Sequence, residues 1–187
     1  MLKNIFLLGS ITLLSATAAD AQKFFTKTGR IDFNATAPSS PEKIEAVNKT
    51  VTCVLDAASG AIQFAVLIKG FTFERALMQE HFNENYLESD KFPKAEFKGT
   101  ITNNGSVNYT KDGEYTVTVK GKLTLHGETR DVESPGKITV KGGKISASAS
   151  FSAVLGDYKV DVPALVSDKV SKTAKITVAC SLEPLKS

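Results

Sequence analysis

The stretch EYTVTVKGKLTLHGETR, residues 114–130, alternates almost without interruption between apolar and polar side chains. The apolar positions share one face of an extended chain and are Tyr115, Val117, Val119, Leu123 and Leu125. Threonines, lysines and His126 occupy the other face. Successive side chains of a β-strand point to opposite sides, so this period of two is typical of a strand with one buried face. The stretch therefore predicts a long strand that ends in a turn at His126-Gly127.

The same period governs most of the chain. The expected strands cover residues 25–35, 43–56, 61–73, 93–102, 114–126, 138–141, 144–155 and 174–182, with a shorter extended piece at 130–133. Turn signals separate them, the strongest being Gly142-Gly143 between two strands. About eight strands joined by turns predict an all-β fold, an antiparallel barrel or a sandwich.

One segment breaks this pattern. Residues 74–88 show no alternation, are rich in Glu, Leu, Met and Gln, and precede Pro93. This composition predicts a helix inserted between two strands. The insert contains Arg75 and one of only two histidines, His81.

The N-terminus has the three parts of a secretory signal peptide. Lys3 is the positive residue, residues 5–14 are the apolar run, and Ala19-Asp20-Ala21 fits a cleavage site. We expect residues 1–21 to be removed and residues 22–187 to form one exported, periplasmic domain. An anchor that stays attached is the alternative. No later segment is apolar and long enough to predict a transmembrane helix.

Composition argues against several classes of function. The formal net charge is only +3, and the lysines alternate with acidic residues, so no basic run predicts nucleic-acid binding. No Gly-x-Ser-x-Gly motif indicates a nucleophilic serine. Two histidines supply too few nitrogen ligands to predict a zinc site. We therefore expect neither an enzyme nor a bound metal or cofactor.

Cys53 and Cys180 are the only cysteines, and both fall on apolar strand faces. In an exported chain, a pair of this kind is compatible with one disulfide. Burial as two small apolar side chains is the alternative interpretation.

The strand at residues 144–155 has an unusual apolar face. Ile145, Ala147, Ala149 and Phe151 alternate with serines. Small inward residues leave room inside a barrel, and an eight-stranded barrel is wide enough to hold one slim ligand.

Two blocks together resemble the YceI-like family of lipocalin-like, polyisoprenoid-binding proteins. The first comprises Arg75, His81, Ser89-Asp90, Phe92-Pro93 and Phe97, and the second is Leu123-Thr-Leu-His-Gly-Glu-Thr129. The chain departs from the family pattern at residues 36–43, which lack a His-Met-Gly-like segment. The spacing from Arg75 to His81 is also longer than usual for the family.

The resemblance implies an extended eight-stranded antiparallel barrel around an apolar tunnel, with an isoprenoid-type lipid, polyprenyl or quinone, as the partner. The expected tunnel wall is Phe33, Phe64, Val66, Ile68, Phe97, Val117, Val119, Leu123 and Phe151. Arg75 and His81 are the candidates for contact with the lipid head group.

Alternatives remain at both histidines and for the function. For His81 the favoured reading is structural, a histidine that bonds a loop carbonyl and fixes the insert. His126 is expected to lie at the surface or to lock its turn. A barrel with a filled core and a structural or protein-binding role in the cell envelope is the alternative to a lipid carrier. The sequence leaves the oligomeric state open, a homodimer included.

Overall fold

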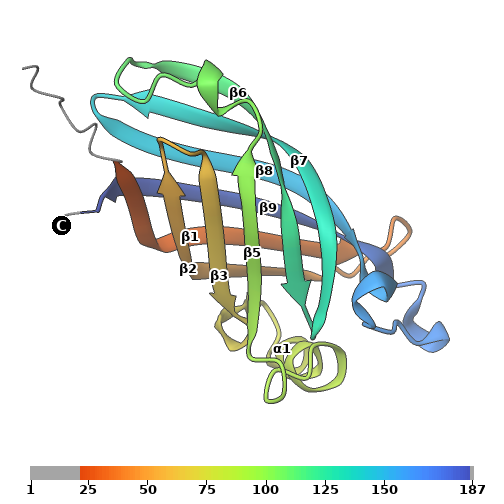
Figure 1. Cartoon of the computed structure of the whole chain (residues 1–187). Coiled ribbons are helices and arrows are strands. Elements are labelled where there is room, and N and C mark those ends of the chain that lie inside the picture. Colours follow the sequence, from red (N-terminus) through yellow and green to blue (C-terminus); the bar gives the residue numbers. More distant parts are fainter. Residues whose placement is uncertain (1–21, 186–187) are drawn as a thin grey trace, which may run out of the picture.

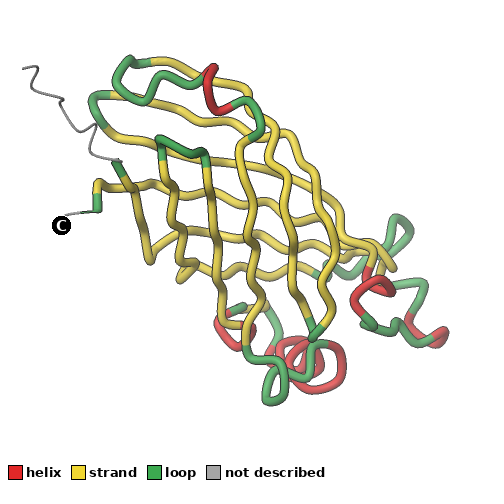
Figure 2. The backbone as a smooth tube through the Cα atoms, viewed as in Figure 1, coloured by secondary structure: helices red, strands yellow, loops and turns green. Residues whose placement is uncertain are grey.

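The structure, a computed structural model, describes residues 22–185. The predicted signal peptide lies outside this range. The strands are β1 (Lys23–Thr36), β2 (Glu45–Asp56), β3 (Ala61–Leu67), β4 (Thr72–Phe73), β5 (Lys94–Ile101), β6 (Gly113–Leu125), β7 (Glu128–Lys141), β8 (Lys144–Val154) and β9 (Val170–Pro184). Long strands that form the front and back walls of a barrel make up most of the molecule, as Figures 1 and 2 show.

The strands close into a ring. Hydrogen-bonded neighbours follow the order β1-β9-β8-β7-β6-β5-β3-β2, and β2 pairs again with β1. Every pairing is antiparallel, and the two-residue β4 is attached to β2. The predicted eight-stranded antiparallel barrel is therefore confirmed. Closure leaves no strand of the ring with a wholly unpaired edge, the feature that makes open sheets prone to pair with other chains.

Alternation along the strands directs apolar side chains into the barrel, as predicted. On β8, Ile145 and Ala147 are buried while Ser146 and Ser148 are exposed. On β6, Val117 is buried while Lys120 faces solvent.

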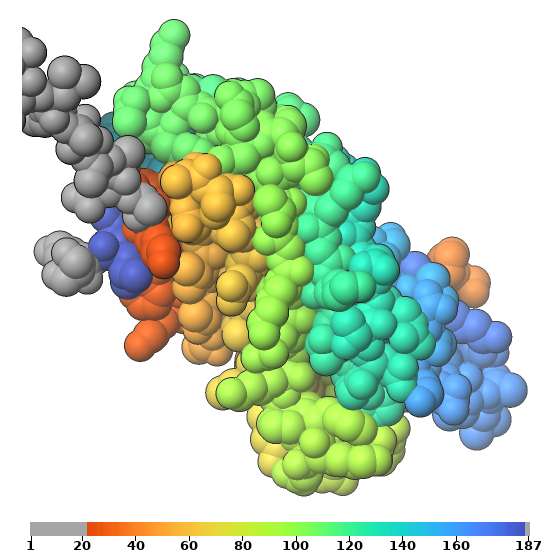
Figure 3. All heavy atoms as spheres, in the orientation of Figure 1, coloured from red at the N-terminus to blue at the C-terminus, as the bar shows by residue number. Residues whose placement is uncertain are grey.

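The insert is helical over a shorter range than residues 74–88. Helix α1 (Ala76–His81) runs directly into a π-helical turn, η2 (Phe82–Tyr86). Arg75, the residue before α1, is already extended, because the two-residue strand β4 pairs with β2 just before it. The space-filling view shows the insert as a lobe at one end of the barrel (Figure 3).

Two further boundaries differ from the prediction. Residues 61–73 are not one strand, since the 3₁₀ turn η1 (Ile68–Gly70) separates β3 from β4. Residues 130–133 and 138–141 belong to one strand, β7, which runs through Pro135. Pro135 lies opposite Thr118 on β6. The backbone N–H and C=O of Thr118 form hydrogen bonds with residues 102–103, on the side away from Pro135. The missing N–H of the proline would therefore face β8, where the ladder has not yet begun.

Backbone hydrogen bonds join β7 to β8 along only about half of β7. β8 pairs with β7 from Gly136 to Lys141, and β7 has no strand partner on this side from Glu128 to Pro135. We call this stretch the β7–β8 seam. A 3₁₀ turn after β8, η4 (Leu155–Tyr158), packs against β7 there. Ser134 also donates a hydrogen bond across the seam to the backbone oxygen of Ser150, at 3.1 Å.

The loop between β5 and β6 covers the opposite end of the barrel. Tyr109 stacks on Phe24 with ring centroids 6.3 Å apart, and its hydroxyl donates to Asn104 Oδ1 at 2.7 Å. Asn104 in turn donates to the backbone oxygen of Ala57 at 2.9 Å. Burial raises the pKa of Tyr109 to about 12. Within residues 22–185, no helix has the length and apolar character needed to cross a membrane.

Candidate functional site

An apolar cavity of about 450 Å³ occupies the inside of the barrel. Its volume falls in the range of small-molecule pockets in proteins. Part of this space exists because several lining side chains on β8 and β9 are small. They are Ala147, Ala149, Ala153 and Ala174. An interior packed to native density would need larger side chains at these positions. The barrel is therefore hollow on the side where the sequence placed its small residues.

All nine apolar residues predicted for the tunnel wall line this cavity. Phe33 comes from β1, Phe64 and Val66 from β3, Ile68 from η1, Phe97 from β5, Val117, Val119 and Leu123 from β6, and Phe151 from β8. The orientation of Phe64, Val66 and Ile68 had no clear signal in the sequence. The structure turns all three inward. The nine side chains form one surface contributed by six separate elements, and alternation identified the part of it on β1, β5, β6 and β8.

Aromatic rings hold the insert against the barrel. Phe82, at the start of the π-helical turn, is buried and packs against Phe33, Phe71 and Phe73, with ring centroids 4.9–5.5 Å apart. Each pair is tilted or edge-on, the arrangement that aromatic quadrupoles favour. Phe82 is thus the residue through which the insert closes part of the cavity.

The cavity opens beside the N-terminal end of α1. Several lining residues there are solvent-exposed, among them Arg75, Leu77, His81 and Lys169. Figure 1 shows α1 and the segment after β8 at this end of the barrel. These exposed lining residues mark the mouth of the cavity.

Three charges meet at the mouth. Arg75 Nη1 lies 2.5 Å from Glu42 Oε1, and Lys169 Nζ lies 3.7 Å from Glu42 Oε2. The side chain of Glu42 is 25% exposed, against 68% for Arg75 and 53% for Lys169. Ion pairs this exposed contribute little to stability and exchange readily with water or another anion. Arg75 is therefore at the mouth, as predicted, but in contact with a carboxylate of the chain itself.

The two histidines have different roles. His81 lines the mouth, is exposed, and makes no side-chain hydrogen bond within residues 22–185. The favoured structural reading of His81 was therefore wrong, because the bonds expected of it are made by His126. His126 Nδ1 lies 3.0 Å from the backbone oxygen of Tyr158, and Nε2 lies 2.8 Å from Glu88 Oε2.

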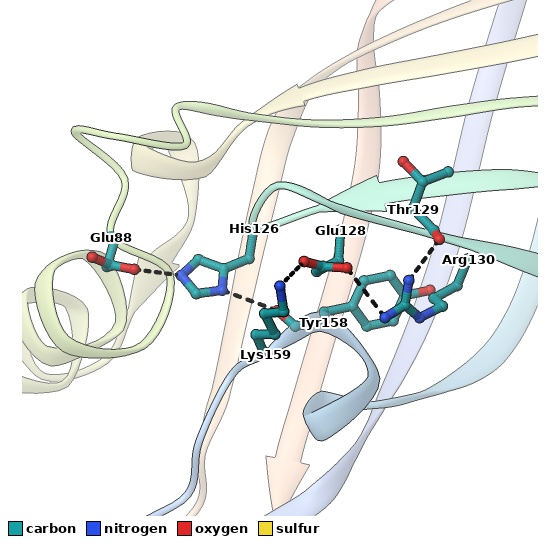
Figure 4. Close-up of polar contacts among 7 residues, drawn as sticks. All are labelled: Glu88, His126, Glu128, Thr129, Arg130, Tyr158 and Lys159. Atoms are coloured by element: carbon teal, nitrogen blue, oxygen red, sulfur yellow. Dashed lines mark hydrogen bonds and ion pairs between the residues drawn. The ribbon is translucent and has the colours of Figure 1, made fainter.

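His126 joins three segments, as Figure 4 shows. It sits in the β6–β7 turn with φ 51° and is followed by Gly127 with φ 78°. Its partners belong to the insert and to η4, so it locks the turn and anchors both neighbours. The ring also packs edge-on against Phe92, with centroids 4.7 Å apart. The turn-locking role predicted for His126 is what the structure shows.

A second polar contact spans the seam beside His126. Lys159 Nζ lies 2.5 Å from Glu128 Oε1, and Arg130 Nη2 lies 3.2 Å from Glu128 Oε2 (Figure 4). The hydrogen bond from Lys159, with the positive charges of Lys159 and Arg130, holds the pKa of Glu128 below its usual range. These contacts connect β7 to the segment after η4, in the part of β7 that has no strand partner on this side.

Within the described residues, no cluster of three or more His, Cys, Asp and Glu side chains could hold a metal ion. The site offers an apolar interior and a charged mouth. Sequence reasoning missed Glu42 and Lys169, which lie in irregular loops. The only signal that could have found Glu42 is the unpaired positive charge of Arg75 at an apolar opening.

Comparison with solved structures places this fold among known ones. A polyisoprenoid binding domain from Saccharophagus degradans, implicated in plant cell wall breakdown, superposes with a TM-score of 0.74 over 88% of this chain and 99% of that domain, at 11% identity. Burkholderia cenocepacia BcnA gives a TM-score of 0.65 over 83% of this chain and 96% of that protein, at 15% identity. The YceI protein of Campylobacter jejuni gives 0.55 over 79% and 88%, at 17% identity.

At these identities the likeness shows a shared fold. A comparison with curated proteins found no match. The model of the YceI-like domain, however, matches residues 12–182, almost the whole chain. With its closed barrel, short helical insert and hollow apolar interior, the chain belongs to the family of YceI-like domains.

Proposed function

We propose that this protein is an exported lipid-binding protein that sequesters or carries an isoprenoid-type lipid, polyprenyl or quinone, inside its barrel. The observation that carries the proposal is the apolar cavity of about 450 Å³, walled by side chains from almost every strand. Such a cavity fits a ligand with much hydrocarbon surface and few hydrogen-bonding groups. The description of the Saccharophagus degradans domain as polyisoprenoid binding supports the same class of ligand.

The energetics favour a long tail over a specific head group. Each buried CH₂ group contributes about 0.8 kcal/mol, so a few isoprene units supply most of the affinity of a micromolar complex. The tail would lie against the nine wall residues. This arrangement lets the protein select a class of lipid by shape and length, with no catalytic group involved.

The head group would remain at the mouth. Arg75 is always charged and is the better candidate to contact a phosphate or a carbonyl oxygen. His81 faces the same opening. Because Glu42 already contacts Arg75, an anionic head group would have to displace the Glu42 carboxylate, whereas a carbonyl could use the donors that Arg75 leaves free.

The test is to purify the protein natively from its own host, extract it with organic solvent and identify the extract by mass spectrometry. We expect an isoprenoid lipid in stoichiometric amount. Protein that never carries lipid, from its host or after incubation with polyprenyl or quinone lipids, would instead support the envelope barrel with a structural or protein-binding role. Intact mass of protein recovered from a bacterial periplasm tests export, with loss of residues 1–21 as the expected result.

A further inference from the structure

Two buried cysteines lie on strands that flank β1 on opposite sides. Cys53 is on β2 and Cys180 is on β9, with 0% and 4% of their surface exposed. Both are free thiols in the structure. Neither lines the lipid cavity, so they form a feature separate from the site proposed above.

Strand β1 bulges between them. On the β2 side, Thr26 pairs with Cys53 and Gly29 with Val51, so β1 uses one residue more than β2 over this step. On the β9 side, the register breaks between Phe25 and Arg30, again with one extra residue on β1. A bulge bends a strand and leaves the extra residue out of the ladder. The barrel wall is therefore locally distorted where the two cysteines approach β1.

Glycine at position 29 provides the space for the sulfur. A Cβ atom built on Gly29 would lie 2.6 Å from Cys180 Sγ and 3.2 Å from Val51 Cβ. The Cys180 sulfur thus occupies the place of a side chain at position 29 and reaches toward β2. There it comes close enough to the thiol of Cys53 for the two groups to affect each other's ionisation. The two sulfurs meet beneath a strand that would otherwise keep their own strands apart.

The interaction makes the pKa values of the two thiols unequal. The pKa of Cys53 is raised by the neighbouring Cys180 and by burial. The pKa of Cys180 is lowered because the neighbouring Cys53 thiol stabilises its thiolate. Pairs of unequal thiols in contact are common where one cysteine attacks a disulfide and the other resolves the product.

We propose that Cys53 and Cys180 are a thiol–disulfide pair, and that in an oxidising compartment they form a disulfide that joins β2 to β9 beneath β1. The oxidant is a disulfide-bearing protein or small molecule. The Cys180 thiolate attacks one sulfur of the oxidant's disulfide. The sulfur–sulfur bond of the oxidant breaks, and its other sulfur leaves as the first thiolate. Cys53 gives its proton to water and attacks Cys180 Sγ, which releases the second thiolate. Two electrons pass to the oxidant, and the two cysteines lose two protons.

The outer wall offers the approach. Cys180 borders a depression in the barrel wall, together with the exposed residues Thr28 and Arg30 of the bulged strand. Oxidation from this side does not require an empty cavity. The link closes a large loop between an early and a late strand, and such loops restrict the unfolded chain most. We therefore expect oxidation to stabilise the barrel.

The experiment uses the wild-type protein, unfolded and then refolded in a buffer of oxidised and reduced glutathione set to an extracytoplasmic potential. Refolding removes burial as a barrier to reaction. Intact mass after denaturation in iodoacetamide should show no alkylation and the loss of two hydrogens. A non-reducing digest should contain the Cys53 and Cys180 peptides linked together. The melting temperature of the oxidised protein should exceed that of the reduced protein by several degrees.

Cys53→Ala and Cys180→Ala are the matched controls. Each leaves one thiol, and we expect a glutathione adduct or a free thiol with a redox-independent melting temperature. Gly29→Ala should reduce the linked fraction, because the new Cβ displaces the Cys180 sulfur. Wild-type protein that refolds with both thiols alkylated, or with only glutathione adducts, would overturn the proposal. That result needs no variant to fold, and it leaves the lipid proposal untouched.

Discussion

His126 and Glu88, 38 residues apart in sequence, meet at 2.8 Å, and both have left-handed backbone conformations, with φ 51° and 40°. Left-handed conformations are uncommon for residues other than glycine, although histidine adopts them more often than glutamate, so surrounding contacts help to maintain them. Here the hydrogen bond between the two side chains helps to maintain both backbone conformations. The same imidazole also reaches the backbone oxygen of Tyr158, so one side chain fixes a turn, the insert and the start of the seam.

Substitution of His126 should therefore weaken the barrel more than loss of an ordinary turn residue. His126→Ala removes two hydrogen bonds and keeps a strained backbone, and we expect a loss of about 2 kcal/mol in the free energy of unfolding. His126→Asn tolerates the left-handed conformation and should cost less. Urea unfolding of both variants measures the difference. Equal stability of His126→Ala and wild type would show that the contacts of the ring contribute nothing.

Blocking the cavity should abolish lipid retention without unfolding the protein. Val119→Trp and Ala149→Phe add bulk to the cavity wall, which has free space at these positions. Overpacking a filled core costs about 1–3 kcal/mol, and less where a ligand space exists. Retention of a long-chain polyprenyl or quinone lipid and the melting temperature are measured together.

Ser150→Phe is the control for Ala149→Phe, because it adds the same ring one residue away on the exposed face. It should leave lipid retention unchanged. Unfolding by both cavity variants, combined with a parent protein that never carries lipid, would show that the interior is a packed core.

Removal of the Phe82 ring should loosen the insert. The ring is buried among three other phenylalanines, and truncation of a buried phenylalanine costs about 3–5 kcal/mol. We expect Phe82→Ala to lower the melting temperature and to speed proteolysis within residues 74–92. Leu77→Ala, at an exposed position on the same insert, is the matched control and should change neither. A proteolysis rate equal to that of wild type would contradict the anchoring role of Phe82.

The Glu128 contacts should give the seam a dependence on pH. Lys159 and Arg130 lower the pKa of Glu128 in the folded protein, so the folded state binds its proton less tightly than the unfolded chain does. The stabilisation is complete above the ordinary pKa of a glutamate and is lost as pH falls through the lowered, folded-state value. Glu128→Gln should therefore melt below wild type at neutral pH and match it in acid. Its partners Lys159 and Arg130 are exposed, so the effect will be small and sensitive to salt.

Alternation identified the strands and the cavity wall because period two fixes both the conformation and the face of a side chain. The inward orientation of a wall residue such as Val119 follows from its own strand, without information about the neighbouring strands. The contacts of Glu42 with Arg75, and of Glu88 with His126, depend on where distant loops come to rest. No local pattern encodes them. The later start of the helix has a similar origin, since the pairing of β4 with the distant strand β2 ends only at Phe73, and Arg75 is still extended.

The β7–β8 seam has a consequence for how such a barrel exchanges its contents. Parting a laddered wall breaks a row of backbone hydrogen bonds together. Parting the wall at β7 between Glu128 and Pro135 breaks side-chain contacts and the packing of η4, but no ladder. The amides of this stretch should then exchange with deuterium sooner than those of β6. Under the proposed function, a bound lipid tail would then have a lateral way out of the barrel at this stretch, in addition to the mouth beside α1.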